Sequence, residues 1–304
     1  MQKGEIMGFP KLLSPNKIES LEPMGTNYAN QDGSVSQRLI DYHVAKAKGG
    51  FGFVIIEATA VDPCGKTIAN QLGLWSNEHI AGVKKIVDEC HKYGSKVSVQ
   101  LCHAGRETNA LITDIHLVSS SATPSPKCLE IPSELTTEEV YGIIQKFVDA
   151  ARRCWDASVD AVEVHAAYGY LIDQFLSSRM NKRVDEFGGN LENRMRFLLL
   201  IIQGIRQQVD NAYPIIVRIS DEEGSSGGFS ITEISTIVRH LEDAGVNAIL
   251  VSTRPGYLAY LAEKIKKSVK IPVIIKFLLL PLADTLNLIS QRIFGRLARR
   301  IWSN

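Results

Sequence analysis

Three side chains that can donate or transfer a proton stand close together in the middle of the chain. His165 ends the short apolar run at residues 160–165, and Tyr168 and Tyr170 follow it. Runs of this kind predict buried strands, and parallel α/β enzymes keep their reactive groups where strands end. An imidazole and two phenols at such a place can donate hydrogen bonds and transfer protons. The structural alternative is a group of core aromatics around one buried histidine.

Two further polar side chains belong to apolar, strand-like runs. Gln100 lies near the end of the run at residues 96–103, and its amide can both donate and accept hydrogen bonds. Arg218 lies inside the run PIIVRIS at residues 214–220. A guanidinium within an apolar strand is unfavourable unless it meets a negative partner. A bound group that carries negative charge would be such a partner, and a structural salt bridge is the alternative.

The composition describes an ordinary globular protein. Of its 304 residues, 45% are apolar and 22% are charged, and the net charge is +1. This near-neutral balance gives no reason to expect nucleic acid or an acidic membrane surface as a partner. Five cysteines stand singly, without a CxxC pair, so we expect neither a disulfide framework nor a metal site. The N-terminus lacks a signal-peptide core and no apolar run has membrane-spanning length, which favours a cytoplasmic protein.

Strand-like and helix-like segments alternate along the chain. The expected strands are residues 51–59, 96–103, 160–165, 214–220, 247–252 and 271–275; the expected helices are residues 36–48, 77–93, 138–155, 190–209 and a segment near 258–269. Thr136 with Glu139, and Ser230 with Glu233, form capping patterns that begin two helices. The segment 108–132 is rich in Ser, Thr and Pro and has no periodicity, which predicts a long loop. Loops of this length in compact domains usually cover active sites. The alternation predicts one parallel α/β architecture, although periodicity alone does not separate a closed barrel from an open sheet.

Residues 162–197, which read VEVHAAYGYLIDQFLSSRMNKRVDEFGGNLENRMRF, closely resemble the segment after the fourth barrel strand of the Old Yellow Enzyme family of flavin-dependent ene-reductases. The stretch QLCHAGR from Gln100 and the turn PMGTN from Pro23 resemble two further motifs of that family. The resemblance runs from about Pro10 to Ile275 and implies an α/β fold of the (β/α)8 TIM-barrel type. Residues 1–275 would form the FMN-binding domain, and residues 276–304 a divergent basic tail.

The resemblance also implies FMN as the cofactor and NADH or NADPH as the electron donor. Gln100 would contact the pyrimidine edge of the flavin, and Arg218 would stabilise the negative charge of the reduced ring. Further contacts with the ring would come from the backbone of Pro23, Met24 and Gly25 and from Ala58.

By the same resemblance, the substrate would be a small enone or enoyl compound. A hydride would pass from the nicotinamide to the flavin and then to the β-carbon of the substrate, while Tyr170 protonates the α-carbon as general acid. His165 and Tyr168 would hold the carbonyl oxygen in the manner of an oxyanion hole. Position 168 departs from the family, which usually has His or Asn there, so we expect an altered reach or substrate size. A homo-oligomer is possible.

Both ends of the barrel depart from the family pattern. Strand one looks shortened before Pro23, and no glycine pair follows Ile275, where the family continues to an eighth strand that helps to hold the flavin phosphate. The alternative function is therefore a truncated, inactive remnant that cannot retain FMN, because an open sheet edge and lost phosphate contacts would prevent binding. A phosphate-binding barrel of aldolase or isomerase type is a third reading; its only candidate strand-end lysine is Lys276.

Overall fold

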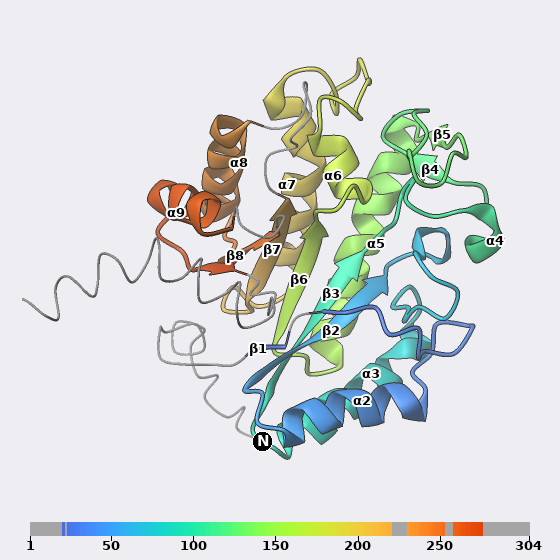
Figure 1. The fold of residues 1–304 in the computed structure, drawn as a ribbon, viewed down its shortest axis with the longest axis vertical. Helices are drawn as coiled ribbons and strands as arrows, with labels where there is room; N and C mark the ends of the chain where they lie inside the picture. Colours follow the sequence, from blue (N-terminus) through green and yellow to red (C-terminus); the bar gives the residue numbers. More distant parts are fainter. Residues whose placement is uncertain (1–19, 22, 221–229, 253–257, 276–304) are drawn as a thin grey trace, which may run out of the picture.

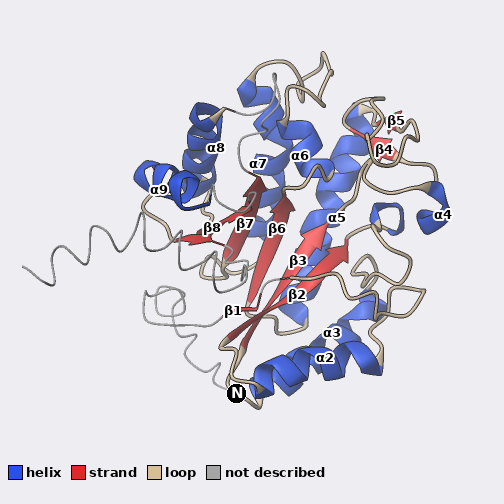
Figure 2. Cartoon of the chain, in the orientation of Figure 1, coloured by secondary structure: helices blue, strands red, loops and turns tan. Residues whose placement is uncertain are grey.

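Seven parallel strands form one sheet in the order β1-β2-β3-β6-β7-β8-β9, and the main helices lie outside it (Figures 1 and 2). The computed structural model describes residues 20–21, 23–220, 230–252 and 258–275. The strands are β1 (Ser20–Leu21), β2 (Phe53–Ala60), β3 (Lys96–Cys102), β6 (Ala161–Ala166), β7 (Ile215–Ser220), β8 (Ala248–Ser252) and β9 (Val273–Ile275). The longer helices are α2 (Gln37–Lys48), α3 (Ile80–His91), α5 (Thr137–Asp156), α7 (Leu191–Gln208), α8 (Ile231–Asp243) and α9 (Leu258–Ser268). This order confirms the predicted alternation of strand and helix.

Two apolar clusters lie on opposite faces of the sheet, because successive strand residues point to opposite sides. The larger cluster joins the strands to the helices around them. The smaller one lies on the other face and consists of Phe53, Ile55, Ala161, Ile216, Ala248 and Leu250, with Ile274 packed against it. Both faces are therefore buried, which explains why the strands read as nearly continuous apolar runs.

Capping side chains fix where the predicted helices begin. The Ser36 hydroxyl accepts a hydrogen bond from the Leu39 N–H at the start of α2. Thr136 and Glu139 form the predicted capping box at α5, and Ser230 and Glu233 form the predicted one at α8. Each box satisfies two backbone N–H groups that a helix start leaves without partners.

Local structure departs from the prediction in three places. The expected loop at residues 108–132 contains the short helix α4 (Ala110–Thr113) and the strand β4 (Val118–Ser119), which pairs with β5 (Ser133–Glu134). The helix expected at 77–93 begins as a 3-10 turn, η2 (Asn77–His79), and α6 (Leu171–Leu176) was not predicted as a helix. These elements are too short for periodicity to reveal. A second 3-10 turn, η1 (Pro63–Gly65), follows β2.

The departures expected before Pro23 and after Ile275 concern segments at residues 1–19, 22 and 276–304, which lie outside the described residues. Within the described sheet, β1 pairs with β2 and β9 pairs with β8, so these two strands are its edges. None of the described helices is long and apolar enough to cross a bilayer.

An ion-paired turn connects α6 to α7. The Arg183 guanidinium donates to the Asp185 carboxylate, which lowers the pKa of Asp185 to about 2.

A Cβ added at Gly188 would overlap the backbone carbonyl of Arg183. We expect Gly188→Ala to lower the free energy of unfolding by about 1–3 kcal/mol, since backbone must shift. In urea unfolding, the control Gly142→Ala, in open space on α5, should instead gain about 0.5–1 kcal/mol. Equal effects of the two changes would contradict this account.

Burial makes His43 of α2 a source of pH-dependent stability. Its side chain is 1% exposed, and desolvation lowers its pKa from 6.5 to about 4. Between pH 6.5 and about 4, His43 is therefore protonated in the unfolded chain but neutral in the folded chain. The free energy of unfolding decreases as the pH falls through this range. In His43→Leu the slope of unfolding free energy against pH should be smaller by up to about 1.4 kcal/mol per pH unit. Urea unfolding between these pH values measures this slope; an unchanged slope would refute the assignment.

Candidate functional site

Polar side chains gather at the carboxyl ends of the central strands, on the face that carries the smaller apolar cluster. Along β6, Ala161 of that cluster is followed two and four residues later by Glu163 and His165. By the same alternation, Arg218 lies two residues after Ile216 on β7. The register pairs Gln100 with Glu163 and His165 with Arg218. The structure thus brings four polar groups from three adjacent strands to one end of the sheet.

Arg218 is 2% exposed and lies across the end of this group. Its Nε donates to the Ser252 Oγ at 2.6 Å, and its Nη2 donates to the Tyr168 hydroxyl at 3.0 Å. The guanidinium carbon also lies 4.9 Å from the centre of the Tyr168 ring, so the cation stacks on the phenol that it binds. Because a guanidinium keeps its charge in proteins, this end of the sheet carries a fixed positive charge.

Gln100 is held by a carboxyl group that sequence reasoning missed. Its Nε2 donates to Glu163 Oε1 at 2.5 Å, and both side chains are buried. This bond orients the Gln100 amide, since one of its two N–H donors is fixed on the neighbouring strand. The signal was present in the sequence, because Glu163 stands two residues before His165 and must share its face of the strand.

The three predicted proton-handling residues do come together. The His165 ring lies 4.9 Å from the Tyr170 ring and 5.8 Å from the Tyr168 ring, centre to centre, in edge-to-face contacts. Burial, and then the charge of Arg218, lowers the pKa of His165 well below 6.5, so its ring is neutral at physiological pH. Burial raises the pKa of Tyr170 above 10, which keeps its phenol protonated. The group therefore consists of neutral hydrogen-bond donors beside a fixed cation.

Tyr168 adopts a backbone conformation that is rare for residues other than glycine. Its φ is 62°, and Gly169 follows at 78°. A side chain in this left-handed region costs roughly 1–2 kcal/mol, so neighbouring groups must stabilise the turn. The N–H of Tyr168 donates to the Ser220 Oγ at 2.9 Å, and that of Gly169 donates to Asp173 Oδ2 at 2.7 Å. Half exposed at 46%, the Tyr168 phenol reaches from this turn to Arg218.

The predicted flavin-contacting turn lies beside β2. Its anchor is Glu57, whose Oε2 accepts the Thr26 N–H at 2.7 Å and whose carboxyl is 1% exposed; desolvation raises the pKa of Glu57. Glu57 stands where the register of β2 against β3 shifts, and the next residue, Ala58, pairs with Gln100. Of the turn itself, Pro23 is buried, whereas Met24 and Gly25 are exposed. The turn is connected to Gln100 through β2, because Glu57 bonds the turn and Ala58 pairs with Gln100.

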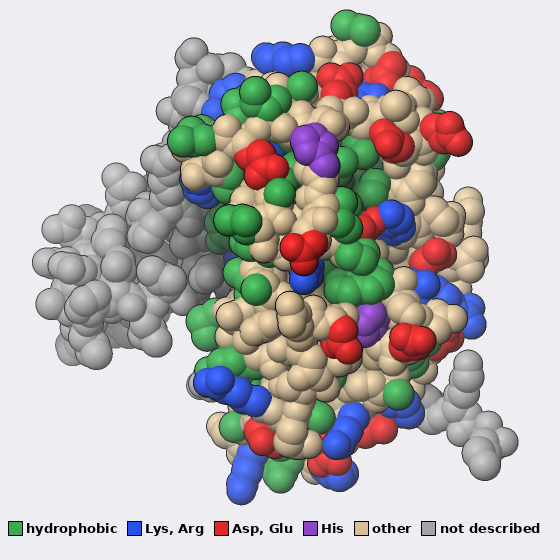
Figure 3. Space-filling view, turned by 90° about the vertical axis from the view of Figure 1, so that its right-hand side faces the viewer, with side chains coloured by type: hydrophobic (Ala, Val, Ile, Leu, Met, Phe, Trp, Pro, Cys, Tyr) green, Lys and Arg blue, Asp and Glu red, His purple; other side chains and the backbone are tan. Residues whose placement is uncertain are grey.

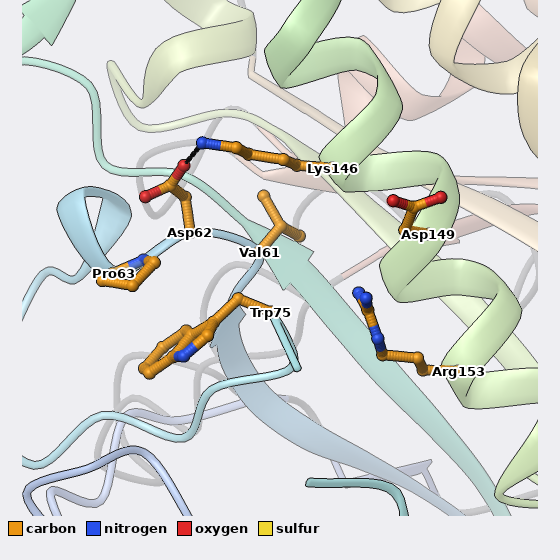
Figure 4. A pocket seen from close by; sticks show the side chains of 7 residues that line it. All are labelled: Val61, Asp62, Pro63, Trp75, Lys146, Asp149 and Arg153. Carbon is orange, nitrogen blue, oxygen red and sulfur yellow. Dashed lines mark hydrogen bonds and ion pairs between the residues drawn. The ribbon is translucent and has the colours of Figure 1, made fainter. Parts of the chain in front are cut away.

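A small cavity of about 160 Å³ lies elsewhere, between the segment after β2 and the outer helix α5. Figure 4 shows the Lys146 ammonium bonded to the Asp62 carboxylate at its edge, with Trp75 and Arg153 on the other sides. Ligand sites usually enclose about 300–1,000 Å³, and none of the predicted site residues lines this cavity. Because its cation and anion neutralise each other, we assign no function to it.

Asp62, Cys64 and His103 place one donor atom each within 4.8 Å of one another. The His103 Nδ1 accepts the Gly105 N–H at 3.1 Å, so the proton of this neutral imidazole lies on Nε2, 3.4 Å from the Cys64 sulfur. Burial raises the pKa of Cys64 to about 12 and lowers that of His103 to about 4. Lys146 already supplies the cation for Asp62. The polar atoms of this cluster are thus bonded within the protein, the imidazole to Gly105 and Cys64 and the carboxylate to Lys146.

Acidic and basic side chains are interspersed over the face of the molecule drawn in Figure 3. The net charge of +1 agrees with this mixture. An extended field of one sign, of the kind that attracts polyanions, is absent from the described residues visible on that face.

Comparison with known proteins shows that the chain resembles one family of enzymes. The family model described as NADH:flavin oxidoreductase / NADH oxidase matches residues 17–271. An NADH oxidase of Thermoanaerobacter brockii is 45% identical over 291 residues, which cover 88% of this chain and 45% of that protein. An NADPH dehydrogenase of Clostridium acetobutylicum is 36% identical over 264 residues, which cover 84% of this chain and 77% of that protein.

Solved structures agree with these relatives. A complex of 2-naphthoyl-CoA reductase with 2-naphthoyl-CoA superimposes with a TM-score of 0.82 at 31% identity, covering 88% of this chain and 46% of that one. Morphinone reductase superimposes at 0.76 with 24% identity, covering 84% of this chain and 74% of that one, and supports the fold alone. The chain spans less than half the length of the first relative and of 2-naphthoyl-CoA reductase.

The fold is that of the TIM-barrel flavin oxidoreductases. The chain belongs to the NADH:flavin oxidoreductase / NADH oxidase family, which includes the Old Yellow Enzyme, and the predicted resemblance is thereby confirmed. FMN is the cofactor of this family, and NADH or NADPH is its electron donor.

The residues present fit the ring end of FMN. A buried guanidinium at Arg218 and an oriented amide at Gln100 offer donors at one end of the sheet, as the oxygen-rich pyrimidine edge of the flavin requires. The expected contacts with the phosphate belong to residues after Ile275, which lie outside the described residues.

Proposed function

We propose that this chain binds FMN and reduces the C=C bond of α,β-unsaturated carbonyl compounds with electrons from NADH or NADPH. The observation that carries the proposal is the juxtaposition of Arg218, His165 and Tyr170. A fixed cation, a neutral imidazole and a protonated phenol stand side by side at the carboxyl end of the sheet. FMN, when bound, supplies the hydride chemistry; the side chains supply position, charge and a proton.

Each side chain has a distinct role in this proposal. Gln100 and Arg218 bind the pyrimidine edge of FMN, while the backbone of Pro23, Met24 and Gly25 and the residue Ala58 line the ring. His165 and Tyr168 donate hydrogen bonds to the carbonyl oxygen of the substrate, which draws electron density from the β-carbon. Tyr170 donates its phenolic proton to the α-carbon as the hydride arrives at the β-carbon, and solvent then reprotonates Tyr170.

The neutral state of His165 supports this assignment of roles. A neutral imidazole has one N–H to donate, and no partner for the His165 Nδ1 is found among the described residues. Burial raises the pKa of Tyr170, so its phenol is protonated and can donate a proton at neutral pH. The two adjacent rings would thus offer a hydrogen bond for the carbonyl oxygen and a proton for the α-carbon.

The test is reconstitution of the purified chain with FMN, followed by desalting, an absorbance spectrum and assay with 2-cyclohexenone. Retained flavin that NADH or NADPH bleaches, and that the enone reoxidises without oxygen, is the expected result. Bleaching without reoxidation by any of a panel of enones would refute the C=C reductase assignment while leaving the flavin role. A chain that retains no FMN would instead support the inactive remnant.

A further inference from the structure

Tyr168 is attached to β7 at both of its ends. Its backbone N–H donates to the Ser220 Oγ at 2.9 Å, and its phenol oxygen accepts from Arg218 Nη2 at 3.0 Å. Arg218 and Ser220 are two residues apart on one strand, so both side chains point to the same face. The phenol therefore lies along β7, with the side chain half exposed.

The Ser220 hydroxyl is itself oriented by a buried carboxylate. It donates to Asp173 Oδ2 at 3.2 Å, which leaves its lone pairs for the Tyr168 N–H. The same Asp173 oxygen accepts the Gly169 N–H at 2.7 Å, and Asp173 is 3% exposed. Two backbone N–H groups of the left-handed turn thus depend on one carboxylate, one of them directly and the other through a serine.

We propose that Ser220 and Asp173 are positioning residues, which hold the turn at Tyr168 so that its phenol stays on Arg218. This inference rests on the proposed function and deepens it. A phenol has one hydrogen to donate. Because Arg218 donates to the phenol oxygen, that hydrogen remains for the carbonyl oxygen of a substrate. If Ser220 or Asp173 released the turn, the left-handed backbone of Tyr168 would relax and the phenol would leave this position.

The substitution Ser220→Ala removes the acceptor, and Ser220→Thr restores it. Asp173→Ala and Asp173→Asn form a second pair, because an Asn oxygen can still accept both hydrogen bonds. Ser98→Ala is the matched control, since Ser98 is another buried serine of the sheet and makes none of these contacts. Should Ser220→Ala fail to fold, the Asp173 pair carries the same comparison.

The first readout is hydrogen–deuterium exchange of the peptide that contains Tyr168 and Gly169, measured in FMN-free protein. Exchange at the Tyr168 amide should be roughly tenfold faster in Ser220→Ala, and exchange at the Gly169 amide should be roughly tenfold faster in Asp173→Ala, because each substitution removes the direct acceptor of that amide. The Thr, Asn and Ser98 variants should match the wild type. Unchanged exchange in both alanine variants would overturn the inference. This readout stands even if the chain has no reductase activity, so the two proposals can fail separately.

The second readout separates the two half-reactions of the FMN-loaded protein. Reoxidation by the enone should slow by roughly tenfold to a hundredfold in Ser220→Ala, the range that a misplaced positioning group produces. Reduction by NADH or NADPH should be unchanged, since Arg218 keeps its charge and its bond to Ser252 when the phenol moves away. A parallel fall of both half-reactions, together with the melting temperature, would show a general structural role and overturn the inference.

Discussion

Replacement of Tyr170 by phenylalanine is expected to slow reduction of the enone by roughly 10²–10⁴-fold, the contribution of a positioned general acid. The substitution removes one hydroxyl and leaves the ring that contacts His165 at 4.9 Å. FMN affinity and the rate at which NADH or NADPH reduces the bound flavin should be unchanged, because Tyr170 has no part in the flavin contacts proposed above. Rapid-mixing absorbance of the two half-reactions measures both rates.

A matched phenol deletion controls for this prediction. Tyr141→Phe removes the hydroxyl of an exposed tyrosine on α5 that donates to Glu186. Its enone rate should equal that of the wild type. If Tyr170→Phe were also within twofold of the wild type, the proton would come from another group or from water, and the role of Tyr170 as acid would be wrong.

Much of the fold was predictable because its signals are local. Buried parallel strands have continuous apolar runs, and Ser or Thr three residues before Glu begins a helix, so β7 and α5 were placed to within a residue or two. The short helix α6 gave no such signal. All six of its residues are buried, so it shows no alternation between an apolar and a polar face. Its position depends on tertiary packing.

The proton donors of the candidate site could be predicted from the sequence, but the residues that orient the site through hydrogen bonds could not. His165 and Tyr170 follow a strand end in sequence, which is a local pattern. Glu163, Ser220 and Asp173 act through residues far away in the sequence: the Gln100 bond spans 63 positions and the Ser220–Asp173 bond spans 47. No pattern in one sequence specifies such pairs, because they arise only when strands are placed in register.

Replacement of Arg218 by glutamine is expected to weaken FMN binding by roughly 10–100-fold, since a hydrogen bond to a charged group contributes about 1.5–3 kcal/mol. Glutamine keeps a donor but not the charge. The midpoint potential of the bound flavin should also fall, because the guanidinium stabilises the negative charge that reduction adds at the pyrimidine edge. Fluorescence titration gives the affinity, and a dye-coupled reduction gives the potential.

The control must separate loss of a hydrogen-bonded arginine from loss of this particular charge. Arg206 of α7 is suitable, because its guanidinium bonds the Gly245 carbonyl and the Asn247 side chain at the opposite, amino-terminal end of the strands. Arg206→Gln should lower thermal stability but leave the flavin potential unchanged. A fall in potential in both variants would mean that Arg218 acts only through the fold. A fall confined to Arg218→Gln would mean that its charge acts on the flavin, which is the reason why an arginine lies inside an apolar strand.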